Sequence, residues 1–246
     1  MRKTVIILSV LAAVLSGCKQ ATDKTADRNE KYNTQNIALS DSCYHLLENF
    51  VDSTQIGKKG HNKIEISTYV NNSNDDCFVR IFFYSKGKYN DVRKTDWWSC
   101  NDFIFEGCGM ELFPEISDFN NDGYNDFTYH SFEGARGANN TRKLFIYNPE
   151  KDEFIYIKNS ENYPNLSYNK ELDCINAFAF YGCNATHFLK LQGDSLHLLA
   201  SVELCGNGEL TVQEFDKYGN EKSVKHKINN EFERFVPFTN YNPLKQ

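Results

Sequence analysis

Long apolar runs are scarce in this sequence of 246 residues, which excludes a protein built from membrane-spanning helices. The longest run, Val5 to Leu15, contains about eleven residues, whereas a helix needs about 20 to cross a bilayer. No later stretch is apolar enough to span one. We therefore expect any membrane attachment to depend on something other than a transmembrane helix.

Catalytic motifs are also absent. The sequence has no Gly-x-Ser-x-Gly elbow, no His-Glu-x-x-His pair and no phosphate-binding loop. Its six histidines are scattered singly, its carboxylates are too numerous to single out a glycosidase pair, and Trp97-Trp98 fits a packed core better than a sugar platform. No two cysteines have the close spacing of a zinc site. We expect a binding protein without catalytic residues.

The N-terminus has the pattern of a lipoprotein signal peptide. Arg2 and Lys3 give a positive start, Val5 to Leu15 an apolar centre, and Leu15-Ser16-Gly17-Cys18 a cleavage site that ends in cysteine. We expect cleavage before Cys18 and lipid on its sulfur. Because Lys19 stands where an aspartate commonly retains lipoproteins at the inner membrane, we expect the anchor in the outer membrane. Of its two faces, we favour the periplasmic face over the cell surface.

The mature chain is acidic. Cleavage removes two of 27 basic residues and no acidic one, so 25 basic residues face 33 acidic ones and the net charge becomes -8. An acidic protein is repelled by nucleic acid and suits a cationic partner, although solubility alone also explains the charge.

The sequence predicts one folded domain behind a tether. Residues 19–36 contain no aliphatic side chain larger than alanine, so they cannot bury enough apolar surface to fold alone. We assign residues 1–17 to the signal peptide, 18–39 to a lipidated tether and 40–246 to a single β-rich domain.

The residue pattern of most of that domain predicts strands and turns. Three hairpins are expected around turns at 71–76, 148–152 and 192–194, with further strands at 126–132, 173–180, 208–216 and 222–228. One short helix is expected after Ser40 or Asp41, because four apolar residues share a helical face: Leu46, Leu47, Phe50 and Val51. These patterns predict an all-β fold with propeller-like antiparallel sheets, or a β-sandwich as the alternative.

Seven cysteines remain after lipidation, and an exported protein uses cysteines mainly in disulfides. If the turn at Gly193 pairs its flanking strands, Cys183 lies diagonal to Cys205, and a small slip or bulge would join them. Cys100 with Cys108, across a short loop containing Gly107, is the second choice. An odd count leaves at least one cysteine unpaired within the chain.

One motif is chemically specific. From Asp118 to Asp126 the sequence DFNNDGYND places oxygen-bearing side chains at positions 1, 3, 5 and 9 and glycine at position 6, the donor pattern of a Ca²⁺ loop. The predicted metal residues are Asp118, Asn120, Asp122, Asp126 and, through its backbone carbonyl, Tyr124. The alternative is an Asx-turn hairpin without metal; we favour calcium because the converging carboxylates would otherwise repel each other.

The loop resembles known calcium loops. It begins like an EF-hand, but position 12 is Tyr129 instead of glutamate and strands flank it. It is more similar to the Asp-rich loops of FG-GAP and VCBS-type β-propeller repeats, in which the position-9 aspartate binds directly.

A wider likeness covers about residues 113–203. It consists of Phe113 to Asp118 before the loop, the glycine-rich stretch Gly134 to Asn140, then Leu144-Phe145-Ile146-Tyr147-Asn148-Pro149, Asn165 to Asn169, and Leu191 to Leu198. This order resembles bacterial envelope proteins that bind calcium, some of which inhibit lysozymes and act as immunity proteins against secreted peptidoglycan-cutting toxins. The cysteines other than Cys18 are not part of that pattern.

The resemblance implies a non-catalytic binder, and an inhibitor of or immunity protein against a lysozyme-like peptidoglycan hydrolase. The Gly134 to Asn140 loop would contact the partner, with Arg136 meeting the carboxylates that glycoside hydrolysis requires. The same loop also reads as a flexible hairpin tip. The alternative function is a glycan- or protein-binding envelope lipoprotein.

Overall fold

The computed structural model describes residues 43–74, 76–87, 97–109, 111–228 and 231–242. The predicted signal peptide, lipidated Cys18, the tether, and the helix caps Ser40 and Asp41 lie outside these residues. Within them, no helix has the length and apolar character needed to cross a membrane.

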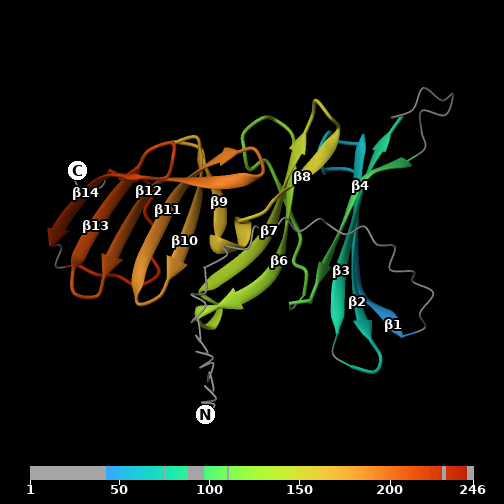
Figure 1. The fold of residues 1–246 in the computed structure, drawn as a ribbon, viewed down its shortest axis with the longest axis horizontal. Coiled ribbons are helices and arrows are strands. Elements are labelled where there is room, and N and C mark those ends of the chain that lie inside the picture. Colours follow the sequence, from blue (N-terminus) through green and yellow to red (C-terminus); the bar gives the residue numbers. More distant parts are fainter. Residues whose placement is uncertain (1–42, 75, 88–96, 110, 229–230, 243–246) are drawn as a thin grey trace, which may run out of the picture. The chain divides into compact units, whose positions relative to one another are not determined.

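The described residues form fourteen strands in three antiparallel sheets (Figure 1). The N-terminal sheet has the order β1 (Tyr44–Asp52), β2 (Asn62–Asn71), β3 (Cys77–Lys86) and β4 (Trp97–Glu106). The middle sheet has the order β5 (Glu115–Ser117), β6 (Asp126–Gly134), β7 (Asn139–Asn148) and β8 (Glu153–Ile157). The C-terminal sheet runs in reverse chain order from β14 (Glu221–Ile228) through β13 (Glu209–Phe215), β12 (Ser195–Cys205), β11 (Cys183–Gln192) and β10 (Cys174–Phe180) to β9 (Leu166–Asn169). Two short 3-10 turns, η1 (Ala135–Gly137) and η2 (Ser160–Asn162), complete the elements.

The all-β prediction is confirmed, and no sheet among the described residues closes on itself. The layered packing is consistent with the sandwich alternative, and a propeller is not shown. The middle sheet is buried on both faces. Phe145 packs toward the N-terminal sheet, whereas its neighbours Leu144 and Ile146 pack toward the C-terminal sheet, because successive strand residues point to opposite faces. This explains the unbroken apolar run 144–147.

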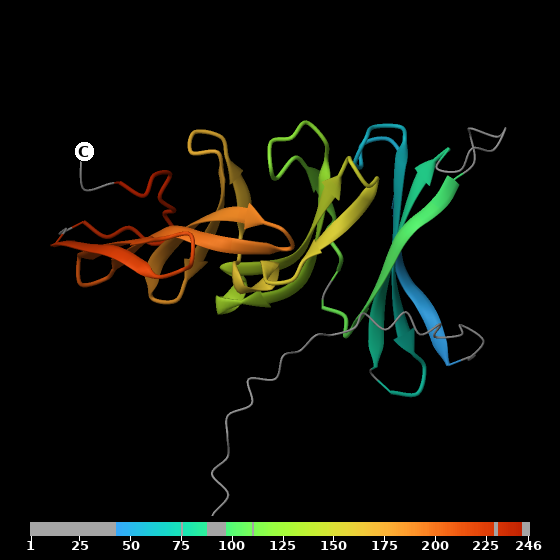
Figure 2. The same ribbon diagram turned by 45° about the horizontal axis from the view of Figure 1, so that its top comes forward.

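A third apolar cluster covers the other face of the C-terminal sheet. Phe188 and Val202 form its floor, and Phe232, Phe238 and Tyr241 of segment 231–242 pack over them. Figure 2 shows this segment running back along the sheet.

All three predicted hairpins are present as β2–β3, β7–β8 and β11–β12, and the four further strands correspond to β6, β10, β13 and β14. The predicted N-terminal helix is wrong. Residues 44–52 instead form β1, which pairs with β2 along its length. Only Phe50 of the four apolar residues packs against the core, while Leu46, Leu47 and Val51 are exposed. Pairing with a neighbouring strand outweighs helical spacing because a helix this short is marginal without an apolar face to bury.

The structure joins Cys183 to Cys205, the pair favoured by the strand register. Gln192 pairs with Ser195 across a two-residue turn, and a bulge between Phe188 and Leu189 shifts the register once more. Together these two shifts place the cysteines directly opposite each other.

The predicted disulfide between Cys100 and Cys108 is wrong, because Cys108 is bonded to Cys77. Cys100 lies on β4, which stays extended to Glu106, so about 20 Å of strand separates it from the strand end. A disulfide needs Cα atoms within about 7 Å. Cys77 begins β3 directly opposite this end, where its carbonyl accepts the Gly107 N–H at 2.8 Å.

Peptide mapping without reduction should therefore recover Cys77 joined to Cys108 and Cys183 joined to Cys205. Replacing both Cys77 and Cys108 by serine should lower the free energy of unfolding by about 3–4 kcal/mol, since the bond closes a loop with a sequence separation of 31. A recovered Cys100–Cys108 peptide would contradict the observed strand register.

Candidate functional site

The predicted calcium loop connects β5 to β6. Asn121 and Gly123 have left-handed backbone, with φ of 58° and 89°, so the chain turns sharply there. The Asp118 carboxylate accepts the N–H groups of Asp122 and Gly123, at 3.2 and 2.9 Å. The Asp122 carboxylate accepts the Tyr124 N–H at 2.9 Å. Local Asx turns therefore hold the loop.

Asp126 has no solvent exposure and closes the loop from beneath. One carboxylate oxygen accepts the Phe119 N–H at 2.7 Å, and the other accepts the Tyr147 N–H at 2.9 Å. Burial, together with the charges of Asp122 and Asp118, raises the pKa of Asp126 to about 8 against the lowering effect of these two bonds. Three acidic groups therefore influence one another here.

The donor types suit a hard cation, although the carboxylates do not converge on one point. In the described residues, the only three metal-ligating side chains with ligand atoms within 4.8 Å of one another are Cys183, Glu203 and Cys205, and both of these sulfurs belong to a disulfide. Asp118, Asp122 and Asp126 form no ion pair with a described residue. The loop therefore offers unneutralised oxygens of the kind Ca²⁺ prefers, presently turned toward backbone N–H groups.

The loop is also fixed to the β1–β2 connection, a contact that no local sequence pattern predicts. Asn125 and Gly57 exchange two backbone hydrogen bonds, at 2.8 and 3.2 Å, and the Asn125 side chain donates to the Gln55 carbonyl at 2.8 Å. Asp52 shapes that connection. Burial alone would raise its pKa, but bonds from the Ile56, Gln55 and Thr54 backbone outweigh burial and lower it.

The second candidate site is the tip between β6 and β7. Ala135, Arg136 and Gly137 are three consecutive left-handed residues, with φ of 50°, 58° and 93°. Such backbone costs about 1–3 kcal/mol for each residue other than glycine, and it persists only where the surroundings impose it. Arg136 is exposed and forms no ion pair with a described residue.

Two asparagines fix the base of the tip. The Asn139 amide donates to the Phe180 carbonyl at 3.0 Å and accepts the Phe180 N–H at 2.8 Å. The Asn165 amide donates to the Ala138 and Phe178 carbonyls, both at 2.8 Å. The base of the tip is thus braced against the C-terminal sheet.

Exposed aromatic rings lie on segments that adjoin the base of the tip. Phe132 precedes it on β6, Tyr181 follows the Phe180 that Asn139 holds, and Phe235 packs on Phe180 with ring centroids 4.4 Å apart. Their exposed fractions are 64%, 59% and 55%. Exposed aromatics beside an arginine match the composition of protein–protein interfaces.

Comparison with known proteins does not identify a family for this chain. No family model and no curated protein matches the chain. A solved structure described as "Structure of a Xanthomonas Type IV Secretion System related protein" is similar over 74% of this chain and 98% of that chain, with a TM-score of 0.46 and 9% sequence identity.

Replacing Asp126 by asparagine should lower the free energy of unfolding by about 1–3 kcal/mol, because an amide nitrogen cannot accept one of the two buried N–H groups. Denaturant unfolding measures the change. Asp122→Asn, at an exposed position of the same loop, is the control and should change stability far less. Equal losses in the two variants would contradict the role of the buried carboxylate.

Proposed function

We propose that this chain is a lipid-anchored, calcium-binding protein of the bacterial outer membrane that binds a lysozyme-like peptidoglycan hydrolase and inhibits it without catalysing a reaction. The signal-peptide pattern supports the anchor, and the Asp-rich loop supports the cation. The braced tip is the observation that carries the binding role.

The tip has the properties of a pre-organised insert. The strained backbone is already formed in the free protein, so little conformational entropy is lost on binding. Arg136 presents a guanidinium that can bond two carboxylate oxygens at once, and glycoside hydrolases use a carboxylate pair. The acidic chain also suits the cationic surface that many lysozymes carry.

Calcium would be held by Asp118, Asn120 and Asp122, the Tyr124 carbonyl and Asp126. When bound, the cation neutralises the carboxylates that burial and mutual repulsion otherwise penalise. Its expected role is structural, because Asp126 joins β6 to β7 and the tip lies at the far end of the same two strands.

Calcium should raise the melting temperature, since a ligand at about a hundredfold excess over its Kd adds about 2.7 kcal/mol to native-state stability. Asp122→Ala should abolish the gain. Asp216→Ala is the matched control, because Asp216 holds a similar Asx turn between β13 and β14 outside the motif. The same melting temperature in calcium and in chelator would contradict the calcium proposal.

The purified chain in excess should slow cell-wall hydrolysis by at least one class of lysozyme. Arg136→Ala should weaken inhibition by about tenfold or more while melting and the calcium response stay unchanged. Lys151→Ala, which removes a cation from the tip of the β7–β8 hairpin, is the control and should inhibit like the parent.

If no lysozyme class is slowed, the glycan- or protein-binding alternative replaces the inhibitor. If Arg136→Ala inhibits as well as the parent, inhibition stands but does not depend on the tip arginine.

A further inference from the structure

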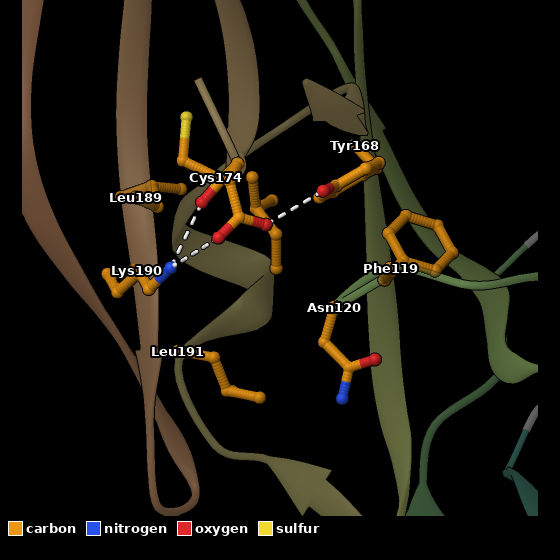
Figure 3. Close-up of a pocket in the computed structure, with 9 residues that line it drawn as sticks. Phe119, Asn120, Tyr168, Cys174, Leu189, Lys190 and Leu191 are labelled. Carbon is orange, nitrogen blue, oxygen red and sulfur yellow. Dashed lines mark hydrogen bonds and ion pairs between the residues drawn. The ribbon is translucent and has the colours of Figure 1, made fainter. Parts of the chain in front are cut away.

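A cleft lies between the calcium loop and the C-terminal sheet, and nothing above assigns it a role (Figure 3). Its volume is about 50 Å³ and its mouth is open, so a ligand would lie partly outside it. Phe119 and Asn120 of the calcium loop form one side, and residues of β9, β10 and β11 form the other. It is separate from the tip between β6 and β7.

One wall of the cleft is a connected polar group. The Tyr168 hydroxyl donates to one carboxylate oxygen of Asp173 at 2.8 Å, and Lys190 Nζ donates to the other at 3.2 Å. Lys190 also donates to the Asp173 carbonyl at 3.0 Å. Asp173 has left-handed backbone, with φ of 47°, which turns its carboxylate between the two partners.

The remaining lining is apolar apart from the Asn120 amide and the Cys174 thiol. Phe119, Ile175 and Leu189 belong to the buried cluster between the middle and C-terminal sheets, and Leu191 packs at its edge. Asn120 stands across from Lys190 and Leu191 in Figure 3. The cleft thus combines an apolar floor with polar groups from both sides.

These groups select the chemistry of a ligand. The carboxylate and the ammonium neutralise each other, so an ion would have to compete with an existing pair, whereas a neutral ligand would not. Lys190 keeps a third N–H, Asn120 has an amide N–H to offer, and the Asp173 oxygens keep further lone pairs. A ligand that fits must therefore donate and accept hydrogen bonds along its edge and be apolar on its face.

A pyranose ring has this distribution, with hydroxyl groups around its edge and C–H groups on its faces. We propose that the cleft binds one pyranose residue of a glycan, with its hydroxyls on Asp173, Lys190 and Asn120 and its apolar face against Leu191. The site goes beyond hydrolase inhibition, and it rests on the calcium proposal only through Asn120, which the loop and the cleft share.

Binding of methyl glucoside and N-acetylglucosamine to the full-length chain can be measured by saturation-transfer NMR and calorimetric titration, with glycine as a zwitterionic control. Lys190→Met and Tyr168→Phe should each raise the Kd of the bound sugar by about tenfold. Leu191→Trp should abolish binding by filling the cleft. Lys225→Met is the matched control, because it removes the Lys225–Glu214 ion pair elsewhere in the same sheet and should leave binding unchanged.

The proposal is overturned if neither sugar binds, if glycine binds more tightly than both, or if Lys190→Met and Tyr168→Phe bind sugar like the parent while melting normally. Titrations in calcium and in chelator keep the two proposals distinct. Sugar binding under either condition supports the cleft, whereas the melting experiment with Asp122→Ala decides the calcium site.

Discussion

The structure depends on one buried carboxylate. Asp126 accepts hydrogen bonds from the backbone of Phe119, which packs in the cluster facing the C-terminal sheet, and of Tyr147, which packs in the cluster facing the N-terminal sheet. A single side chain therefore links the Asp-rich loop to both cores. Burying an acidic group is costly, and hydrogen bonds or a nearby cation must offset that cost.

The middle sheet converts this link into a rigid scaffold. Because both of its faces are buried, β6 and β7 cannot shift without disturbing two apolar clusters. The Asp-rich loop lies at one end of this strand pair and the braced tip at the other. Asn139 and Asn165 then fix the tip to the C-terminal sheet, so the three sheets together determine where Arg136 stands.

Local sequence patterns predicted most of the strands and the loop, because hairpins and Asx turns depend on residues close together in the chain. They failed where distant residues decide the outcome. The apolar spacing of residues 46–51 indicated a helix, whereas these residues form an edge strand. Cys108 is bonded to Cys77 because β3 pairs with β4. Likewise, no local signal places Asn125 beside Gly57, Asn165 beneath the tip, or Asn120 across from Lys190. These contacts depend on how the sheets pack, and the residue spacing within one segment does not predict that packing.

The two disulfides each bracket one antiparallel strand pair. Cys77–Cys108 encloses the connection from β3 to β4, and Cys183–Cys205 encloses the connection from β11 to β12. A protease that cuts either connection therefore leaves a single covalent molecule, with both strands still tied at the opposite end. A nicked chain would therefore stay in one piece until its disulfides were reduced.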